Sequence, residues 1–108
     1  MQTIDLGLGN TELYDGCEIE EVAGRLNLVT PIKEAVQIVG RNTAEIAKTV
    51  EPGGVVLTGP MAVWAYMIVF HAVVHKTATV WYDDGRNSPV LLAAHGSRVE
   101  HEASIPRP

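Results

Sequence analysis

The feature that most constrains this fold is an apolar stretch, residues 55–74, that the pair Gly59-Pro60 divides in two. The part before the pair, Gly54–Leu57, is short and apolar throughout, which is typical of a buried central strand. The part after it, residues 61–74, is fourteen residues long, whereas a membrane-spanning helix needs about 20. The sequence therefore predicts a buried strand, a tight turn and a core helix over 61–76, and no membrane partner.

A second helical pattern begins upstream, at Thr30-Pro31, which we interpret as an N-cap and a first helical residue. Apolar residues recur at helical spacing up to Gly40, and Asn42 with Glu45 three positions on resembles a capping box that restarts the helix. The pattern predicts either one kinked helix or two before the turn at Pro52-Gly53-Gly54.

Four further segments have the composition of strands. Gln2–Leu8 and Arg25–Val29 carry alternating apolar residues, and Thr77–Asp83 and Val90–Ala94 flank a loop of turn-forming residues, which predicts a hairpin. We therefore expect one α/β domain over 1–108, with a small mixed sheet and two main helices, and an end that frays from about residue 102.

The helix over 61–76 is apolar nearly all round, so it should pack against the sheet on one side and against a second subunit on the other. We accordingly expect a homodimer.

Charge and cysteine content limit the classes of function. The 8 Lys+Arg against 13 Asp+Glu give a net charge of -5, which disfavours a general polyanion binder, DNA included. The single cysteine, Cys17, cannot form an intramolecular disulfide, and the chain starts without the pattern of a signal peptide. We expect a cytoplasmic protein.

Two histidines stand one helical turn apart, at His71 and His75. Such a pair can present two imidazoles to one metal ion, but the glutamate of the metalloprotease motif is missing between them. The simpler interpretation buries His71 in the core. His75 lies at the polar end of the helix, where solvent or a ligand can reach it.

Asp83, Asp84 and Arg86 occupy the loop after a strand. Their simplest interpretation is a solvated hairpin turn. If the strands before this loop and before the Thr58-Gly59-Pro60 turn are parallel, however, both lie at the carboxyl edge of the sheet, where α/β proteins bind ligands. His75 would lie at the far end of a helix about 22 Å long, so a site that uses both ends needs two subunits.

Several of these residues follow one another along the chain in an order that is found in a known protein family. The run Gly54–Pro60 is followed by Val63-Trp64-Ala65-Tyr66, then by His75, by Asp84 and Arg86 two positions apart, and by Ala94-His95. This order resembles the small stand-alone CRISPR-associated ring nuclease family, distant relatives of the CRISPR-associated Rossmann-fold sensors. The resemblance covers about residues 53 to 96, and the first fifty residues match only in coarse pattern.

The resemblance implies a Rossmann-like ring nuclease fold and a metal-dependent phosphodiesterase. Such an enzyme cleaves cyclic tetra-adenylate, the second messenger of type III CRISPR defence, and dimers stack into a tetramer around this ligand. Manganese is the implied metal. Two alternatives stay open: a manganese-dependent exonuclease acting on RNA 3′ ends, and a non-catalytic protein that binds the cyclic messenger. The net charge disfavours long RNA more than a ligand with four phosphates. An α/β dimer of unrelated role is the plainest alternative.

Site residues carry over from the resemblance by position. His75, Asp84 and His95 would be the metal-binding and acid/base set, with Arg86 as the phosphate clamp. Thr58, Gly59 and Pro60 would form the turn that faces the ligand.

The sequence also departs from the family pattern. Gly85 stands where a proline is expected, Ala94 where a serine is expected, and the adjacent Asp83 leaves open which carboxylate acts. Trp64 and Trp81 are interpreted as core residues rather than as stacking platforms.

Overall fold

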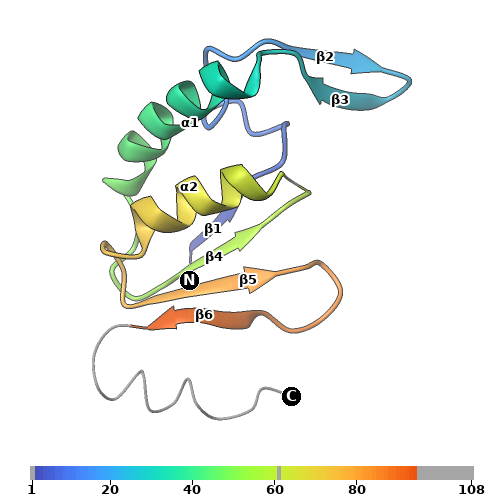
Figure 1. Ribbon diagram of the computed structural model, residues 1–108. Coiled ribbons are helices and arrows are strands. Elements are labelled where there is room, and N and C mark those ends of the chain that lie inside the picture. The colour runs from blue at the N-terminus through green and yellow to red at the C-terminus, as the bar shows by residue number, and fades with distance from the viewer. Residues whose placement is uncertain (1, 61, 95–108) are drawn as a thin grey trace.

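The main sheet joins the two ends of the described chain. In the computed structural model, which describes residues 2–60 and 62–94, this sheet has four strands in the order β1-β4-β5-β6 (Figure 1). They are β1 (Gln2–Asp5), β4 (Val55–Thr58), β5 (Thr79–Asp83) and β6 (Val90–Ala94). The first three run parallel and β6 pairs antiparallel with β5, so the expected mixed sheet and the hairpin over 77–94 are confirmed.

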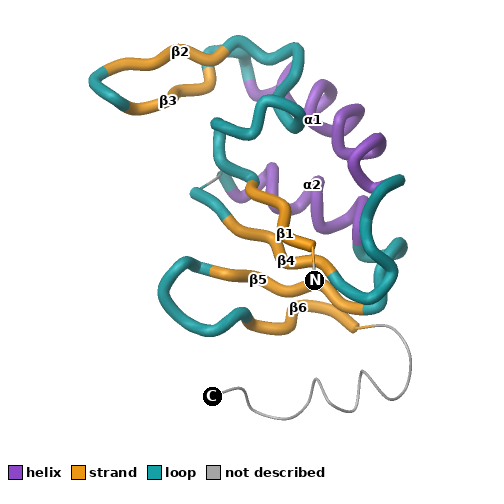
Figure 2. Tube along the Cα trace, turned by 180° about the vertical axis from the view of Figure 1, so that it is seen from behind, coloured by secondary structure: helices purple, strands orange, loops and turns teal. Residues whose placement is uncertain are grey.

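Two helices lie on one side of this sheet (Figures 1 and 2). Helix α1 (Ile32–Ala47) packs on α2 (Val63–Val73), which connects the parallel strands β4 and β5. Their inward side chains meet those of the strands in one hydrophobic core. Its most buried members include Leu6, Leu13, Val39, Val55, Leu57, Val69, Val73 and Val80. The arrangement is an α/β fold with a mixed sheet and two helices.

A two-stranded hairpin extends away from the sheet and lies beside the start of α1 (Figures 1 and 2). It consists of β2 (Ile19–Val22) and β3 (Arg25–Leu28), which pair antiparallel. The connecting residues Ala23 and Gly24 both have positive φ, 53° and 79°, as a tight two-residue hairpin turn requires. The strand expected at 25–29 is therefore confirmed, but it pairs with β2 rather than entering the main sheet.

The expected cap and restart of the first helix are wrong. Pro31 is the N-cap and no side chain caps the helix, because the Thr30 hydroxyl instead accepts a hydrogen bond from the Glu18 amide at 2.6 Å. Asn42 does not restart a helix, since its side chain donates to the carbonyl oxygens of Leu13 and Asp15, both at 2.9 Å. One α-helix therefore runs through the segment and anchors the preceding loop.

Within the described ranges, no helix is both long enough and apolar enough to cross a membrane. The expected fraying from about residue 102 lies outside the described residues.

Candidate functional site

The carboxyl ends of β1, β4 and β5 meet at one edge of the sheet. Asp5 stands opposite Thr58, and Thr58 stands opposite Asp83 in the parallel register. The Thr58 hydroxyl donates to the Asp83 carbonyl oxygen at 2.8 Å, and the Leu6 amide donates to the Thr58 carbonyl oxygen at 2.7 Å. The parallel arrangement that brings the turn after β4 and the loop after β5 together is therefore confirmed.

The turn after β4 is tightly built around Gly59. This glycine has φ 105°, and a Cβ here would clash with the Asp5 carboxylate and lie 2.8 Å from the Gly7 nitrogen. On the other side, the Tyr66 hydroxyl of α2 donates to the Gly59 carbonyl oxygen. Tyr66 also contacts Tyr82 edge to face, with ring centroids 5.6 Å apart. The turn is thus held from the sheet and from the helix, and only glycine fits it.

Tyr66 holds this turn as a neutral hydrogen-bond donor. Burial raises the pKa of Tyr66 above its usual value, and the nearby Tyr82 and Asp5 raise it further. The phenol therefore keeps its proton near neutral pH.

A cavity of about 300 Å³ lies between this turn and the loop after β5. Residues 58–60 form one wall, and residues 82–85 form the other. Arg86 follows directly and is exposed to solvent. The structure thus brings together four of the sequence-predicted residues, Thr58, Gly59, Pro60 and Asp84, with Arg86 next in the chain.

The Asp84 carboxylate organises its own loop. Its Oδ1 accepts hydrogen bonds from the Arg86 and Asn87 amides, each at 2.8 Å, and its Oδ2 accepts one from the Asn87 side chain at 3.0 Å. These backbone hydrogen bonds lower the pKa of Asp84 below its usual value. Asp83 also holds the loop through one hydrogen bond, because its Oδ1 accepts from the Gly85 amide at 2.8 Å. Both carboxylates therefore shape the loop, as the simplest interpretation of this sequence expected.

Gly85 stands where the resemblance leads us to expect a proline, and its backbone conformation shows why a proline does not fit here. Its φ is 82°, a conformation that proline, fixed near −65°, cannot adopt. A proline here would force a different loop, so the backbone between Asp84 and Arg86 follows a path that the expected family residue could not follow.

The histidine pair lies at the other end of α2. Both His71 and His75 are exposed, and their rings are 6.2 Å apart at an angle of 79°. The expected burial of His71 is wrong, because α2 buries a stripe formed by Ala65, Val69 and Val73, and position 71 faces away from that stripe. With eleven residues, α2 is about 16 Å long, so His75 and the Thr58 turn of one chain stand at opposite ends.

Within the described part of one chain, the two metal donors that can be placed, His75 and Asp84, lie apart. Among these residues, no three His, Cys, Asp or Glu side chains gather where a metal ion could bind. His75 and Asp84 lie at opposite ends of the helix–strand unit, and His95 lies outside the described residues. His75 and Asp84 therefore cannot bind the same metal ion within one chain.

Both tryptophans are half-buried. Trp64 packs against the hydrophobic core and also lines a cavity of about 220 Å³ with Leu8, Leu28, Pro60 and Ala62. The core interpretation of Trp64 is thus only partly right, because its side chain also lines this cavity.

Sequence reasoning missed Asp5, which completes the row with Thr58 and Asp83. The same rule that located the other two could have found it, since Asp5 also ends a parallel strand. Arg25 was missed as well, although it lines a cavity with Asp5 at this edge.

Comparison of the chain with protein-family models, with curated proteins and with solved structures gives no match. The candidate site is therefore defined by its geometry and by the motif resemblance.

Proposed function

We propose that this chain is a ring nuclease with a Rossmann-like fold, a phosphodiesterase that cleaves cyclic tetra-adenylate and so ends type III CRISPR signalling. The observation that supports the proposal most is the parallel pairing of β4 and β5, which puts the Thr58-Gly59-Pro60 turn and the Asp84-Gly85-Arg86 loop on either side of one cavity. In the resemblance these are the ligand-facing turn and the catalytic loop.

Cleavage of an RNA linkage needs few groups from the protein, because the RNA carries its own nucleophile. The 2′-hydroxyl next to each linkage attacks the phosphorus, a base removes its proton, and the 5′ oxygen leaves with a proton from an acid. Arg86 would donate to the phosphate oxygens through its guanidinium. His75 is the proposed acid/base group, and His95 the second, because imidazole is the side chain most often used for general acid–base catalysis.

The position of His75 makes the proposed site a shared one. Because His75 stands at the far end of α2 from the turn at Thr58, the two would meet only if subunits stack. A homodimer that stacks into a tetramer around the ligand is therefore part of the proposal.

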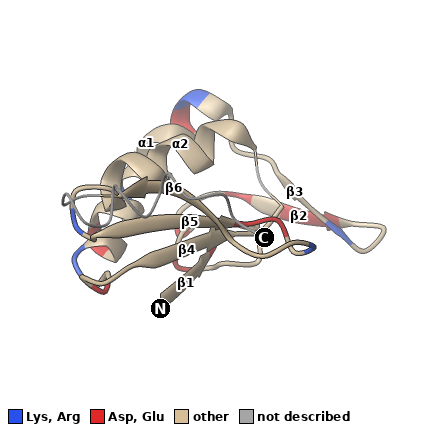
Figure 3. Ribbon diagram, turned by 90° about the horizontal axis from the view of Figure 1, so that it is seen from below, with Lys and Arg blue, Asp and Glu red and all other residues tan. Residues whose placement is uncertain are grey.

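The charge of the edge favours a short ligand. Acidic residues follow β5 and lie along β2. Basic residues lie near the tip of the loop between β5 and β6 and at β3 (Figure 3). Asp5, Asp83 and Asp84 would repel a long phosphate chain, whereas a few placed cations can hold a small one. Manganese enters the proposal only as an ion shared between subunits.

A second candidate is a non-catalytic protein that binds the same messenger. It is favoured by Asp84, whose two carboxylate oxygens already accept three hydrogen bonds from the loop. In that case the loop is a rigid wall of a binding site and not a source of catalytic groups.

Incubation of the purified protein with cyclic tetra-adenylate or with linear RNA, each with manganese or with EDTA, tests the proposal. We expect linear products by chromatography and mass spectrometry, and loss of cleavage with retained binding in the His75→Ala variant. His71→Ala is the matched control, because it removes an exposed imidazole four positions earlier, in the last turn of α2. Binding without products would favour the second candidate. Shortening of linear RNA without ring opening would favour the exonuclease.

A further inference from the structure

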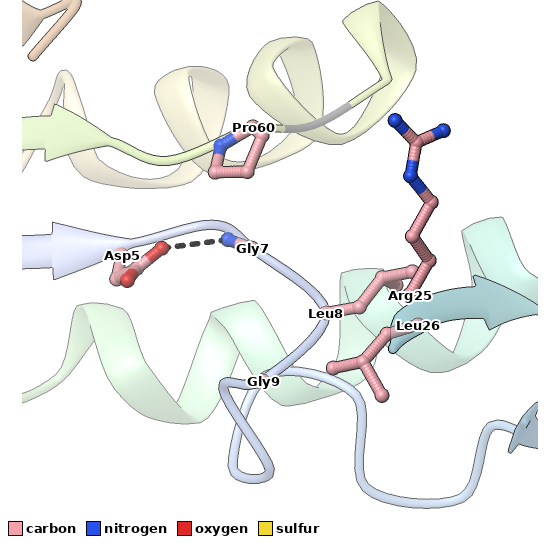
Figure 4. Close-up of a pocket in the computed structure, with 7 residues that line it drawn as sticks. All are labelled: Asp5, Gly7, Leu8, Gly9, Arg25, Leu26 and Pro60. Atoms are coloured by element: carbon pink, nitrogen blue, oxygen red, sulfur yellow. Dashed lines mark hydrogen bonds between the residues drawn. The ribbon is translucent and has the colours of Figure 1, made fainter. Parts of the chain in front are cut away.

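A groove lies between strand β3 and the main body of the protein. Two adjoining cavities form it, one of about 490 Å³, which Figure 4 shows, and one of about 220 Å³. From the hairpin, Leu26 lines the larger cavity and Leu28 the smaller one. We call this space the β3 groove. Its opposite wall includes Leu8, Pro60, Ala62 and Trp64.

Strand β3 also presents an unpaired main-chain edge. The two-residue turn Ala23-Gly24 closes the hairpin with a hydrogen-bonded pair, Val22 and Arg25, and bonded and non-bonded pairs alternate from there. Leu26 and Leu28 belong to the non-bonded pairs, so their amides and carbonyl oxygens point away from β2. In the described part of the chain, these groups have no other hydrogen-bond partner. The edge can therefore accept a further strand.

Both views of the whole chain show that β3, and not β2, is the strand of the hairpin on the side of α2 (Figures 1 and 2). The unpaired edge therefore lies on the side of the hairpin that faces the body of the protein. An extended chain that pairs with this edge would have the side chains of Leu26 and Leu28 beside it and Trp64 and Pro60 opposite.

Two charged residues restrict what can bind. Arg25 is exposed at the start of β3 and forms no ion pair within the described ranges. Asp5 lies at the other side of the larger cavity, and the Arg25 guanidinium points away from it (Figure 4). An acidic group on a bound chain is therefore attracted at Arg25 and repelled at Asp5.

We propose that the β3 groove binds an extended peptide segment of a partner protein, which adds an antiparallel strand to β3. The main chain of the segment pairs with Leu26 and Leu28, its alternate apolar side chains lie against Trp64 and Pro60, and an acidic residue near its C-terminal end lies at Arg25. Main-chain hydrogen bonds supply affinity in this mode of recognition, and pockets for alternate side chains supply specificity. The proposed catalytic residues take no part in it.

A single strand fits this groove better than a second copy of the chain. In a second copy, β3 is joined to β2, and neighbouring strands of a sheet lie about 4.8 Å apart. Pairing of β3 with β3 would therefore place the second β2 against the opposite wall of the groove.

The test uses two libraries of N-acetylated, C-amidated hexapeptides in which threonine alternates with variable apolar residues, one library ending in aspartate and the other in lysine. Amide NMR spectra of the full chain record binding. We expect the amides of Leu26 and Leu28 to shift and to exchange more slowly, because they gain hydrogen bonds. The amide of Asn27 already faces β2 and should change little.

The charge at Arg25 gives a second readout. Peptides ending in aspartate should bind about tenfold tighter than those ending in lysine, and Arg25→Glu should reverse this preference. Lys33→Glu makes the same charge change at an exposed residue of α1 and, as the matched control, should leave the preference unchanged.

N-methylated peptides distinguish strand addition from simple apolar binding. In an added strand, alternate amides face β3, so a methyl group on one of two neighbouring residues should abolish binding and a methyl group on the other should not. Leu26→Ser should weaken binding about tenfold or more. Val22→Ser is the matched control, because it removes a similarly exposed apolar side chain from the opposite face of the hairpin.

Four results would each overturn the proposal. They are no binding by either library, shifts that map away from β3, equal effects of N-methylation at neighbouring residues, and a preference for aspartate that persists in the Arg25→Glu variant. The dispersion of the amide signals shows that each variant is folded, so a loss of binding reports on the groove itself.

Discussion

Thr58 and Asp83 are partners in the parallel register of β4 and β5, and the Thr58 hydroxyl donates a 2.8 Å hydrogen bond to the main-chain oxygen of Asp83. This contact joins the last residue of each strand at the point where the two ligand-facing segments begin. The turn at Gly59 and the loop at Asp84 are therefore fixed relative to each other by the sheet itself. A site on such an edge is preorganised, because the backbone does not have to move to assemble it.

Gly59→Ala should destabilise the protein strongly. The new Cβ would clash with the Asp5 carboxylate, approach the Gly7 nitrogen to 2.8 Å, and hold alanine at φ 105°. We expect the free energy of unfolding to fall by about 2 kcal/mol or more, measured by chemical denaturation. Gly53→Ala is the matched control, since a Cβ at Gly53 meets nothing within 4 Å. Equal stability of the two variants would show that the turn can relax.

Gly40→Ala should have the opposite effect. Gly40 lies inside α1, and a Cβ there meets nothing within 4 Å. Alanine restricts the unfolded chain more than glycine and has a higher helix propensity, so the free energy of unfolding should rise by about 0.5–1 kcal/mol. Thermal and urea denaturation measure the change. A decrease in stability would mean that the helix has less room at this position than the structure indicates.

Local sequence patterns predicted the second half of the chain well. The apolar run, the Gly59-Pro60 break and the turn residues after Asp83 each report on structure formed by nearby residues, and β4, α2, β5 and β6 follow them. The first half depends on contacts between distant residues. Thr30 and Asn42 are bound to Glu18, Leu13 and Asp15, which lie 12 to 29 positions away, and no local pattern encodes such partners.

The candidate site was likewise predicted only in part from the sequence. The edge with Thr58 and Asp83 follows from a general rule for parallel strands. Asp5 obeys the same rule, but the sequence predicts a first strand over Gln2–Leu8, whereas β1 ends at Asp5. An error of three residues at a strand end thus hid a site residue. The β2 strand was missed because two glutamates fill the middle of Ile19–Val22, and glutamate is uncommon in strands.

Asp84→Asn should lower stability in a way that depends on pH. The hydrogen bonds from the Asn87 and Arg86 amides lower the pKa of Asp84 in the folded chain, so the ionised carboxylate favours folding. This contribution is complete above the pKa of an unfolded aspartate, about 4, and is lost as the pH falls through the lower folded value. The parent should therefore melt above the variant at pH 6, and the difference in melting temperature should shrink between pH 4 and pH 2. A difference that stays constant over this range would contradict the role given to the charge.

Mixing two inactive variants tests whether the proposed site is shared between subunits. His75→Ala and Arg86→Ala should each lose cleavage of cyclic tetra-adenylate, since each removes one half of the site. In a mixed assembly, some interfaces join an intact His75 from one chain to an intact Arg86 from another. After subunit exchange, activity should recover to about a quarter of the parent value if chains combine at random in a symmetric assembly. Exchange itself is followed by native mass spectrometry with one isotope-labelled variant. Complete exchange without any recovery would place both residues in a site within one chain, which the opposite ends of α2 make difficult to build.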